Sequence, residues 1–396
     1  MTEKYICPGF RAAGIAAGIK NNGEKDLGLI VSDVPAAVAG VFTRNVVRAA
    51  PVILDRQRLS DGESCRAVIV NSGNANCCNG DQGMRDALAM TVLASEGIGT
   101  PEGQVLVAST GVIGAPLPME KVREAMPTLM EALSPEGMMD CATSIMTTDT
   151  VPKVVTRQGE LDGRPFTVTG MIKGAGMIRP DMATMLCFIM TDAEAEPEFL
   201  KGVLVRSADL SFNRATIDGD TSTNDTVLLL ANGVSGVVVK GAEAEKTFQS
   251  LLDDVCISLT RAMVRDGEGV NTLVELKVVG ADSDEEALRI ADTVAHSPLV
   301  KTAIFGRDAN WGRIMGAAGR AGVAFDPDKI DISFDDVRVV NGGRGSGAEA
   351  EARAAKVMHR PEITLTIDLN MGSGAAAMLT CDFSVEYVKI NADYRS

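Results

Sequence analysis

Residues 173–190 constrain the fold of this chain more than any other stretch, because a Gly-rich loop leads there directly into an uninterrupted apolar run. The loop begins Lys173-Gly-Ala-Gly, and residues 185–190 read Met-Leu-Cys-Phe-Ile-Met. Six successive apolar residues are typical of a strand that is buried on both faces. Such a strand needs packed layers on both sides of its sheet, and it leaves Thr184 at its entrance as a candidate nucleophile.

The turn before Thr184 favours a self-processing reaction. Pro180-Asp-Met-Ala183 predicts a turn from which the Thr184 hydroxyl can reach the carbonyl of the preceding bond. If that bond is cut, Thr184 gains a free α-amine, whose pKa of roughly 8 leaves it partly neutral and able to act as the base. The only histidines of the chain, His296 and His359, lie in no motif of a Ser/His/Asp relay, and we interpret both as structural or surface residues.

Helix-like and strand-like segments alternate through most of the chain. Apolar residues at three- and four-residue spacing predict helices at 81–96, 118–133, 196–211, 243–265 and 285–305. Apolar runs predict strands at 27–31, 67–70, 104–108, 166–168, 185–190, 226–230, 273–279 and 362–369. Strands that alternate with helices predict an α/β fold of layered sheets covered by helices. The segment Gly280-Ala-Asp-Ser-Asp284 marks a predicted domain boundary.

Two loop motifs have a ligand-binding interpretation that we do not favour. Residues 218–225 alternate carboxylates with Gly and hydroxyl residues like a calcium loop, but Leu229 stands where an EF-hand has Glu. We interpret this segment as a loop that satisfies buried backbone groups near the site. Gly345-Ser-Gly347 matches a dinucleotide fingerprint only in part, and we interpret it as a hairpin or helix-entry loop. We therefore predict no metal site.

Charge and composition exclude several classes of partner. The 38 Lys and Arg residues against 53 Asp and Glu give a net charge of −15, which opposes binding to nucleic acid. No run of 18 uncharged apolar residues occurs, and the N-terminal segment does not have the pattern of a signal peptide. We therefore expect a cytoplasmic protein that does not bind a membrane. The eight cysteines lack Cys-x-x-Cys spacing, so we expect reduced thiols.

Several motifs follow one another in a recognisable order. They are Gly9–Lys20, Asn71–Asn76, Ser109–Gly114, Thr147–Asp149, Lys173–Met177, Met182–Leu186, Asp218–Asp225, Asp266–Asn271, Gly306–Arg313 and Tyr387–Ser396. Together they resemble the ArgJ family of glutamate N-acetyltransferases, also called ornithine acetyltransferases. The resemblance runs nearly from end to end of the chain.

This resemblance implies a fold and a processed state. The fold is the α-β-β-α layered sandwich of the ArgJ/DmpA type with a smaller C-terminal α+β domain. Residues 1–280 would form the catalytic sandwich, and residues 281–396 the C-terminal domain, whose tail returns to the active site. A cut between Ala183 and Thr184 would give an α chain of 1–183 and a β chain of 184–396, associated as an α2β2 heterotetramer.

The resemblance also assigns the site residues. Thr184 is the nucleophile, and Thr110 and Gly111 form the oxyanion hole. The residues around the substrate are Thr147, Lys173, Thr184, Glu268, Asn391 and Ser396. Without the resemblance, residues 109–111 would be an ordinary Gly turn and the last residues a frayed tail. The choice between Thr147 and Thr148 as the substrate ligand stays open.

The reaction that the resemblance implies is a ping-pong acetyl transfer from N2-acetyl-L-ornithine to L-glutamate in arginine biosynthesis. Lys173 and Glu268 match the carboxylate and the ammonium group of such substrates. No metal or organic cofactor is required, and whether acetyl-CoA also serves as an acetyl donor stays open. The alternatives are an aminopeptidase-type hydrolase of the same fold and a non-enzymatic binding or scaffold protein.

Overall fold

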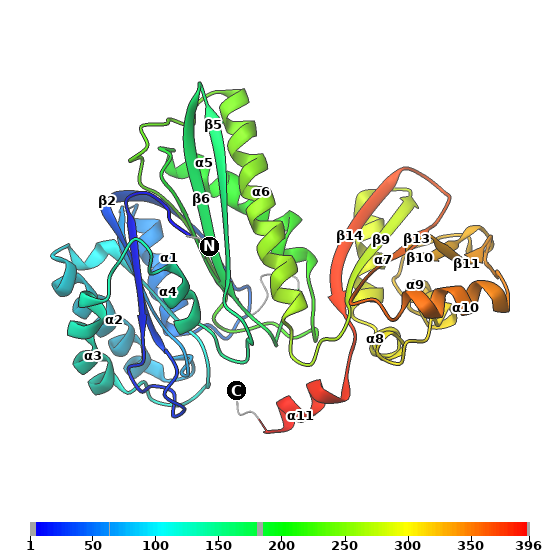
Figure 1. Ribbon diagram of the computed structural model, residues 1–396, viewed down its shortest axis with the longest axis horizontal. Helices are drawn as coiled ribbons and strands as arrows, with labels where there is room; N and C mark the ends of the chain where they lie inside the picture. Colours follow the sequence, from blue (N-terminus) through cyan, green and yellow to red (C-terminus); the bar gives the residue numbers. More distant parts are fainter. Residues whose placement is uncertain (1–4, 63, 180–184, 394–396) are drawn as a thin grey trace. The chain divides into compact units, whose positions relative to one another are not determined.

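The computed structural model describes residues 5–62, 64–179 and 185–393, and these form two compact units (Figure 1). The first unit comprises the described residues of 1–213 together with 220–263. The second comprises 214–219 together with the described residues of 264–395. Each unit has a sheet system and a buried core of its own.

The first unit is built on one long strand that two sheets share. Its strands are β1 (Phe10–Ile15), β2 (Leu27–Phe42), β3 (Cys65–Asn71), β4 (Val105–Ser109), β5 (Lys153–Leu161), β6 (Arg164–Lys173), β7 (Leu186–Thr191) and β8 (Thr226–Ala231). They follow the order β4-β3-β2-β8-β7-β6-β5, and β1 pairs with β2. Residues 27–31 of β2 pair with β1 and β3, whereas residues 37–42 pair with β8. The strand β2 therefore leaves one sheet and enters the other.

The two sheets face each other across an apolar core. Ile30, Val68 and Leu106 of the first sheet share one buried cluster with Phe188 and Leu228 of the second. The short helix α4 (Met138–Ser144) adds Met138 and Cys141 to this cluster. Because β7 and β8 are buried along their whole length, each sheet also needs a cover on its outer face.

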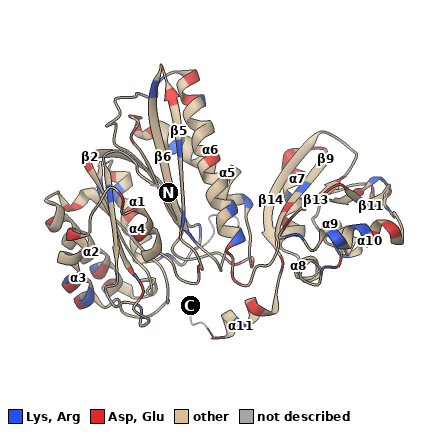
Figure 2. Cartoon of the chain, in the orientation of Figure 1, with Lys and Arg blue, Asp and Glu red and all other residues tan. Residues whose placement is uncertain are grey.

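Helices provide these outer covers. On the first sheet lie α1 (Ala50–Asp61), α2 (Gly80–Ile98) and α3 (Met119–Glu131), whose apolar side chains join a second cluster with β2, β3 and β4. On the second sheet lie α5 (Pro197–Leu210) and α6 (Ala242–Arg265), which are drawn in green beside β5 and β6 (Figure 1). The predicted α-β-β-α sandwich is confirmed. Figure 2 marks Lys, Arg, Asp and Glu residues along the helices and near several strand ends.

The second unit is a six-stranded sheet covered by helices. Its strands are β9 (Leu273–Ala281), β10 (Asp331–Phe334), β11 (Val337–Asn341), β12 (Arg344–Gly345), β13 (Glu362–Asp368) and β14 (Gly374–Cys381), in the order β12-β11-β10-β13-β9-β14. Its helices are α7 (Asp284–Ala295), α8 (Pro298–Phe305), α9 (Trp311–Gly319), α10 (Ala348–Val357) and α11 (Val385–Asp393). Short 3-10 turns elsewhere in the chain lie at Glu102–Gln104, Phe212–Arg214 and Pro327–Lys329.

Several elements differ from the sequence prediction, which did not include the strands β1, β5, β10, β11, β12 and β14 or the helices α1, α4, α9, α10 and α11. The helix predicted over 285–305 is two helices, because Pro298 lacks the N–H of a helix interior and Ser297 accepts a hydrogen bond from the N–H of Val300 as the cap of α8. The strand predicted over 27–31 continues to Phe42 as β2. The polar residues and Pro35 that follow Val31 interrupt the apolar pattern without ending the strand.

The second unit begins earlier in the chain than the boundary drawn from the sequence at 280–284. The reason is that β9 pairs with β13 and β14 and so lies within the second sheet. The division into a catalytic domain of 1–280 and a C-terminal domain of 281–396 stays a prediction about function.

The cysteines and the helices bear on two further expectations. All eight cysteines are free thiols, and Cys78 alone among them is exposed. Burial raises the pKa of both Cys65 and Cys141 to about 12, so these two remain protonated at neutral pH. Within the three described stretches of the chain, every helix is too short or too polar to cross a bilayer.

The close packing of β1 on α4 gives a test of the fold. A Cβ at Gly14 would overlap the carbonyl oxygen of Asp140. We expect Gly14→Ala to lower the free energy of unfolding by about 1–3 kcal/mol, as overpacking does in other cores. Urea denaturation followed by circular dichroism measures the change.

The matched control is Gly202→Ala in α5. There the new Cβ would meet only the end of the flexible Arg206 side chain at 3.5 Å. Alanine in a helix should instead raise the free energy of unfolding by about 0.5–1 kcal/mol. Equal stability changes in the two variants would contradict the packing that the structure gives to Gly14.

Candidate active site

The loop after β4 holds the predicted oxyanion-hole residues in one position. Thr110 is buried, and its backbone N–H donates to the carbonyl oxygen of Asn71 at 3.0 Å. Gly111 has a φ of 129°, and a Cβ there would overlap the backbone of Gly73. Only glycine fits that approach. The close packing of two loops therefore explains why residue 111 is glycine. The oxyanion-hole role of Thr110 and Gly111 stays a prediction.

Two asparagines hold this segment in place, one at the end of β3 and one in the loop before β8. The side-chain amide of Asn224 donates to the carbonyl oxygens of Ala75 and Ser109, each at 2.7 Å. The Ser109 hydroxyl donates to Oδ1 of Asn71 at 2.6 Å. Both asparagines belong to motifs that the sequence singles out, but sequence reasoning missed their role. The sequence did contain one indication of this role, because both asparagines lie at or next to the end of a predicted strand.

Lys173, the last residue of β6, lies next to Thr110. Its side chain is buried, and Nζ donates to Oγ1 of Thr110 at 3.4 Å. The structure thus joins two predicted site residues from strands that lie far apart in the sequence. Thr147 lies half-buried in the loop between α4 and β5, as does Thr148.

A buried carboxylate, Asp149, links these elements, and sequence reasoning gave it no role. Oδ1 accepts hydrogen bonds from Nζ of Lys153 at 2.6 Å and from the N–H of Gly174 at 2.8 Å. Oδ2 accepts one from the N–H of Thr147 at 3.0 Å. Burial by itself raises the pKa of Asp149, but the charges of Lys173 and Lys153 and these hydrogen bonds lower it to about 2. Asp149 is therefore ionised at neutral pH.

The loop before β8 serves buried backbone groups. The carbonyl oxygens of Thr223 and Asp225 accept hydrogen bonds from the N–H groups of Ala49 and Thr43, each at 3.0 Å. These contacts agree with the interpretation of this loop made from the sequence. Among the residues that the structure describes, no group of three or more His, Cys, Asp or Glu side chains could hold a metal ion.

Ala183, Thr184 and Ser396 lie outside the described residues, so their roles stay predictions. The chain is described again from Met185, whose N–H donates to Oδ1 of Asp225 at 3.1 Å. Asp225 is fully buried, and within the described parts of the chain its Oδ2 meets no donor at hydrogen-bond geometry. Burial raises the pKa of Asp225 well above its ordinary value, and the N–H of Met185 offsets this only in part.

Glu268 and Asn391 lie together in the second unit. Nδ2 of Asn391, on α11, donates to Oε2 of Glu268 at 2.6 Å. Glu268 is buried, and its neighbour Gly269 approaches α11 so closely that a Cβ there would lie 2.5 Å from the backbone nitrogen of Tyr387. The segment that sequence alone predicts as a frayed tail is therefore a helix up to Asp393. Its return to the active site stays a prediction.

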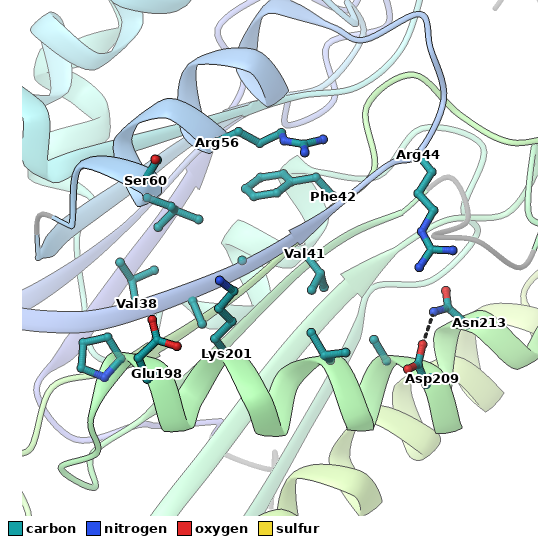
Figure 3. Close-up of a pocket in the computed structure, with 16 residues that line it drawn as sticks. Val38, Val41, Phe42, Arg44, Arg56, Ser60, Glu198, Lys201, Asp209 and Asn213 are labelled. Carbon is teal, nitrogen blue, oxygen red and sulfur yellow. Dashed lines mark hydrogen bonds between the residues drawn. The ribbon is translucent and has the colours of Figure 1, made fainter.

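A separate groove of about 510 Å³ lies along the second half of β2. Figure 3 shows Phe42 beside Arg56 of α1, with Glu198 and Lys201 of α5 near one end of the groove. Asp209 and Asn213 lie at the other end, joined by a hydrogen bond of 2.8 Å. None of the described residues that are assigned to the active site lines this groove.

The chain is similar to known proteins over almost its whole length. The model of the family described as the ArgJ family matches residues 11–396. The arginine biosynthesis bifunctional protein ArgJ of Geobacter sulfurreducens is 52% identical over 390 residues, which are 98% of this chain and 99% of that protein. The protein of the same name from Syntrophotalea carbinolica is 50% identical over 391 residues, which are 98% of this chain and 99% of that protein.

A crystal structure of the arginine biosynthesis bifunctional protein ArgJ from Bacillus halodurans is similar to part of this chain. The TM-score is 0.50 and the sequence identity is 36%. The match covers 98% of that solved chain but 52% of this one.

Asp225 gives a pH-dependent test of this geometry. The folded state keeps the Asp225 proton at pH values where the unfolded chain, with a pKa of about 3.9, has lost it. The free energy of unfolding should therefore fall as the pH rises above about 4. Asp225→Asn keeps an acceptor for the N–H of Met185 but cannot ionise.

We therefore expect the unfolding free energy of Asp225→Asn minus that of the wild type to grow with pH, by at most about 1.4 kcal/mol per pH unit. Urea denaturation of both proteins from pH 4 to pH 7 measures this difference. For Asp55→Asn the unfolding free energy minus that of the wild type should also grow with pH, because burial raises the pKa of Asp55 well above its ordinary value. A difference between Asp225→Asn and the wild type that is constant across the range would contradict the buried, protonated state of Asp225.

Proposed function

The chain belongs to the ArgJ family, and we propose that it is a self-cleaving acetyltransferase of arginine biosynthesis that moves the acetyl group of N2-acetyl-L-ornithine to L-glutamate. The observation that carries this proposal is the meeting of Lys173, Thr110 and Asp149 beside the entrance of β7. Lys173 pairs with Leu186, the first residue of β7, so β7 begins next to this cluster, and Thr184 precedes Leu186 by two residues in the sequence.

The proposed cleavage uses the residues of the chain alone. The Thr184 hydroxyl attacks the carbonyl carbon of Ala183, and the Ala183–Thr184 peptide bond becomes an ester as the Thr184 nitrogen takes up a proton. Water then hydrolyses the ester and leaves chains of 1–183 and 184–396. The coverage of the Bacillus halodurans structure supports this step, since nearly all of that solved chain matches only about half of this one, as a cut chain would.

The proposed transfer has two halves. The Thr184 amine takes the proton of the Thr184 hydroxyl, and the oxygen attacks the acetyl carbonyl of acetylornithine. The Thr110 hydroxyl and the Gly111 N–H donate to the oxyanion, and ornithine leaves with a proton on its amine. The α-amine of glutamate then attacks the acetyl ester, and N-acetylglutamate leaves. The two halves share one site, so the kinetics are ping-pong.

Charged groups hold the ends of the substrates in this proposal. The Lys173 ammonium group binds a substrate carboxylate, and Thr147 lies in the loop that Asp149 fixes. Glu268 binds the side-chain ammonium of ornithine, with Asn391 as its hydrogen-bond partner, and Ser396 completes the pocket. No metal or organic cofactor takes part. The cut chains stay together as an α2β2 heterotetramer in the cytoplasm.

The nucleophile is tested by intact mass and activity. We expect the wild type to give two chains under denaturing conditions, the second beginning Thr-Met-Leu-Cys-Phe. Thr184→Ala should remain one chain and lose acetyl transfer by about 10³-fold or more, because both the hydroxyl and the released amine are missing. Thr184→Ser keeps a hydroxyl and should cleave slowly.

The acetyl donor is identified in the same assay. Labelled acetylornithine and labelled acetyl-CoA are each supplied with glutamate, and N-acetylglutamate is quantified. An active, cleaved Thr184→Ala protein would refute the nucleophile assignment. Release of free acetate that does not depend on glutamate would indicate a hydrolase instead.

Glu268→Gln tests how the donor is bound. Hydrogen bonds to charged groups contribute about 1.5–3 kcal/mol, so the KM for acetylornithine should rise about tenfold or more while kcat changes less. Initial rates against acetylornithine concentration give both constants. The matched control is Glu386→Gln, an exposed carboxylate on α11 that pairs with Lys389. If the two variants have the same KM, Glu268 does not bind the donor.

A further inference from the structure

The loop that joins α4 to β5 carries a single carboxylate with an unusual number of partners. Asp149 accepts hydrogen bonds from the backbone N–H groups of Thr147 and Gly174 and from Nζ of Lys153. Its side chain is fully buried, and that of Lys153 is 2% exposed. Gly174 directly follows Lys173, so one carboxylate fixes the backbone on both the Thr147 loop and the end of β6.

We propose that Asp149 is a positioning residue, which holds Lys173 charged and aimed at Thr110 and so prepares the pocket for a substrate carboxylate. This inference rests on the proposed acetyltransferase function. Nothing in the proposed reaction requires Asp149 to touch the substrate. Its effect passes through Lys173 and through the loop that contains Thr147.

The electrostatic balance of the pocket supports this role. Two buried lysines, Lys153 and Lys173, lie close enough to the buried Asp149 carboxyl group for both of their charges to lower its pKa. Without Asp149, two ammonium groups would be buried beside each other, and the charged form of Lys173 would be disfavoured. A neutral Lys173 would bind a carboxylate much more weakly.

Other titratable groups face this pair. Asp225 interacts with Lys173 from the start of β8. Lys20 interacts with Asp149 from the loop between β1 and β2, and burial lowers the pKa of Lys20. Burial raises the pKa of Asp225 well above its ordinary value, whereas the charges of Lys173 and Lys153 lower that of Asp149, so of the two carboxyl groups Asp149 has the stronger tendency to carry a negative charge. Among the described residues, Asp149 is the carboxyl group beside Lys173 and Lys153 whose pKa these lysines hold low.

The first measurement follows the charge of Lys173 without using activity. The full-length protein is labelled with ε-13C-lysine, and the Lys173 signal is assigned by its loss in Lys173→Arg. Asp149→Asn keeps the shape and a carbonyl acceptor but removes the charge. We expect the pKa of Lys173 to be lower in Asp149→Asn than in the wild type by about one unit or more. The same pKa in both proteins would overturn the proposal.

The second measurement is the pH dependence of the reaction. In Asp149→Asn the alkaline limb of kcat/KM for acetylornithine should move to lower pH by a similar interval, and KM at neutral pH should rise about tenfold with a smaller change in kcat. An alkaline limb and a KM that match those of the wild type would overturn the proposal.

The matched control is Asp55→Asn. Asp55 is also fully buried and accepts a backbone N–H, that of Val107 at 3.0 Å, but it lies on α1. This variant replaces a buried carboxyl group and keeps a carbonyl acceptor, as Asp149→Asn does, but the Lys173 pKa and the alkaline limb should stay at their wild-type positions. Equal shifts in Asp55→Asn and Asp149→Asn would mean that Asp149 is only structural.

Two further outcomes keep the proposal separate from the function on which it rests. If the wild type transfers no acetyl group but the Lys173 pKa still falls in Asp149→Asn, the positioning of Lys173 holds and the proposed function fails. If Asp149→Asn does not fold, Asp149→Glu decides. That variant keeps the charge but moves it by one methylene, so KM should rise while the alkaline limb stays in place, and an unchanged KM would overturn the proposal.

Discussion

The strands β7 and β8 are buried along their whole length, and this burial determines what can lie at their ends. A backbone N–H or carbonyl group at such an end has little access to water, so the protein must supply its partner. Asp225 accepts a hydrogen bond from the N–H of Met185, just before β7. The same holds at the ends of other buried strands: Asn224 donates to the carbonyl oxygen of Ser109 at the end of β4, and Asp149 accepts from the N–H of Gly174 after β6. The polar side chains of the candidate active site gather where buried strands end.

Most elements of the fold follow from local patterns in the sequence, but the way they connect does not. The apolar runs at 185–190 and 226–230 predict β7 and β8 almost residue for residue, because a strand buried on both faces leaves little choice of side chain. The second half of β2 was missed. Its pairing with β8 depends on residues almost two hundred positions away, and no periodicity within β2 records that.

The same holds for the candidate active site, where the sequence identifies residues but not the contacts between them. The resemblance to a family supplied Thr110 and Lys173, and the structure brings them together. Asp149 lay inside a recognised motif, yet its role depends on Lys173 and Gly174, which reach it only after β5 and β6 have formed a hairpin. The distribution of charge is equally hidden. A chain with a net charge of −15 places two buried lysines, Lys153 and Lys173, near the buried Asp149, and an overall count cannot reveal such a local arrangement.

The strand order of the first unit has a consequence for a chain that is cut after residue 183. The two strands that follow the cut, β7 and β8, lie between β2 and β6, which precede it. The fragment that begins at residue 184 would therefore supply two strands that strands of the other fragment flank on both sides. The fragments could part only by giving up two rows of interstrand hydrogen bonds and the core between the sheets, so their exchange between molecules would be as slow as global unfolding. Because of this strand order, the two associated fragments would be held together about as firmly as the parts of an uncut chain.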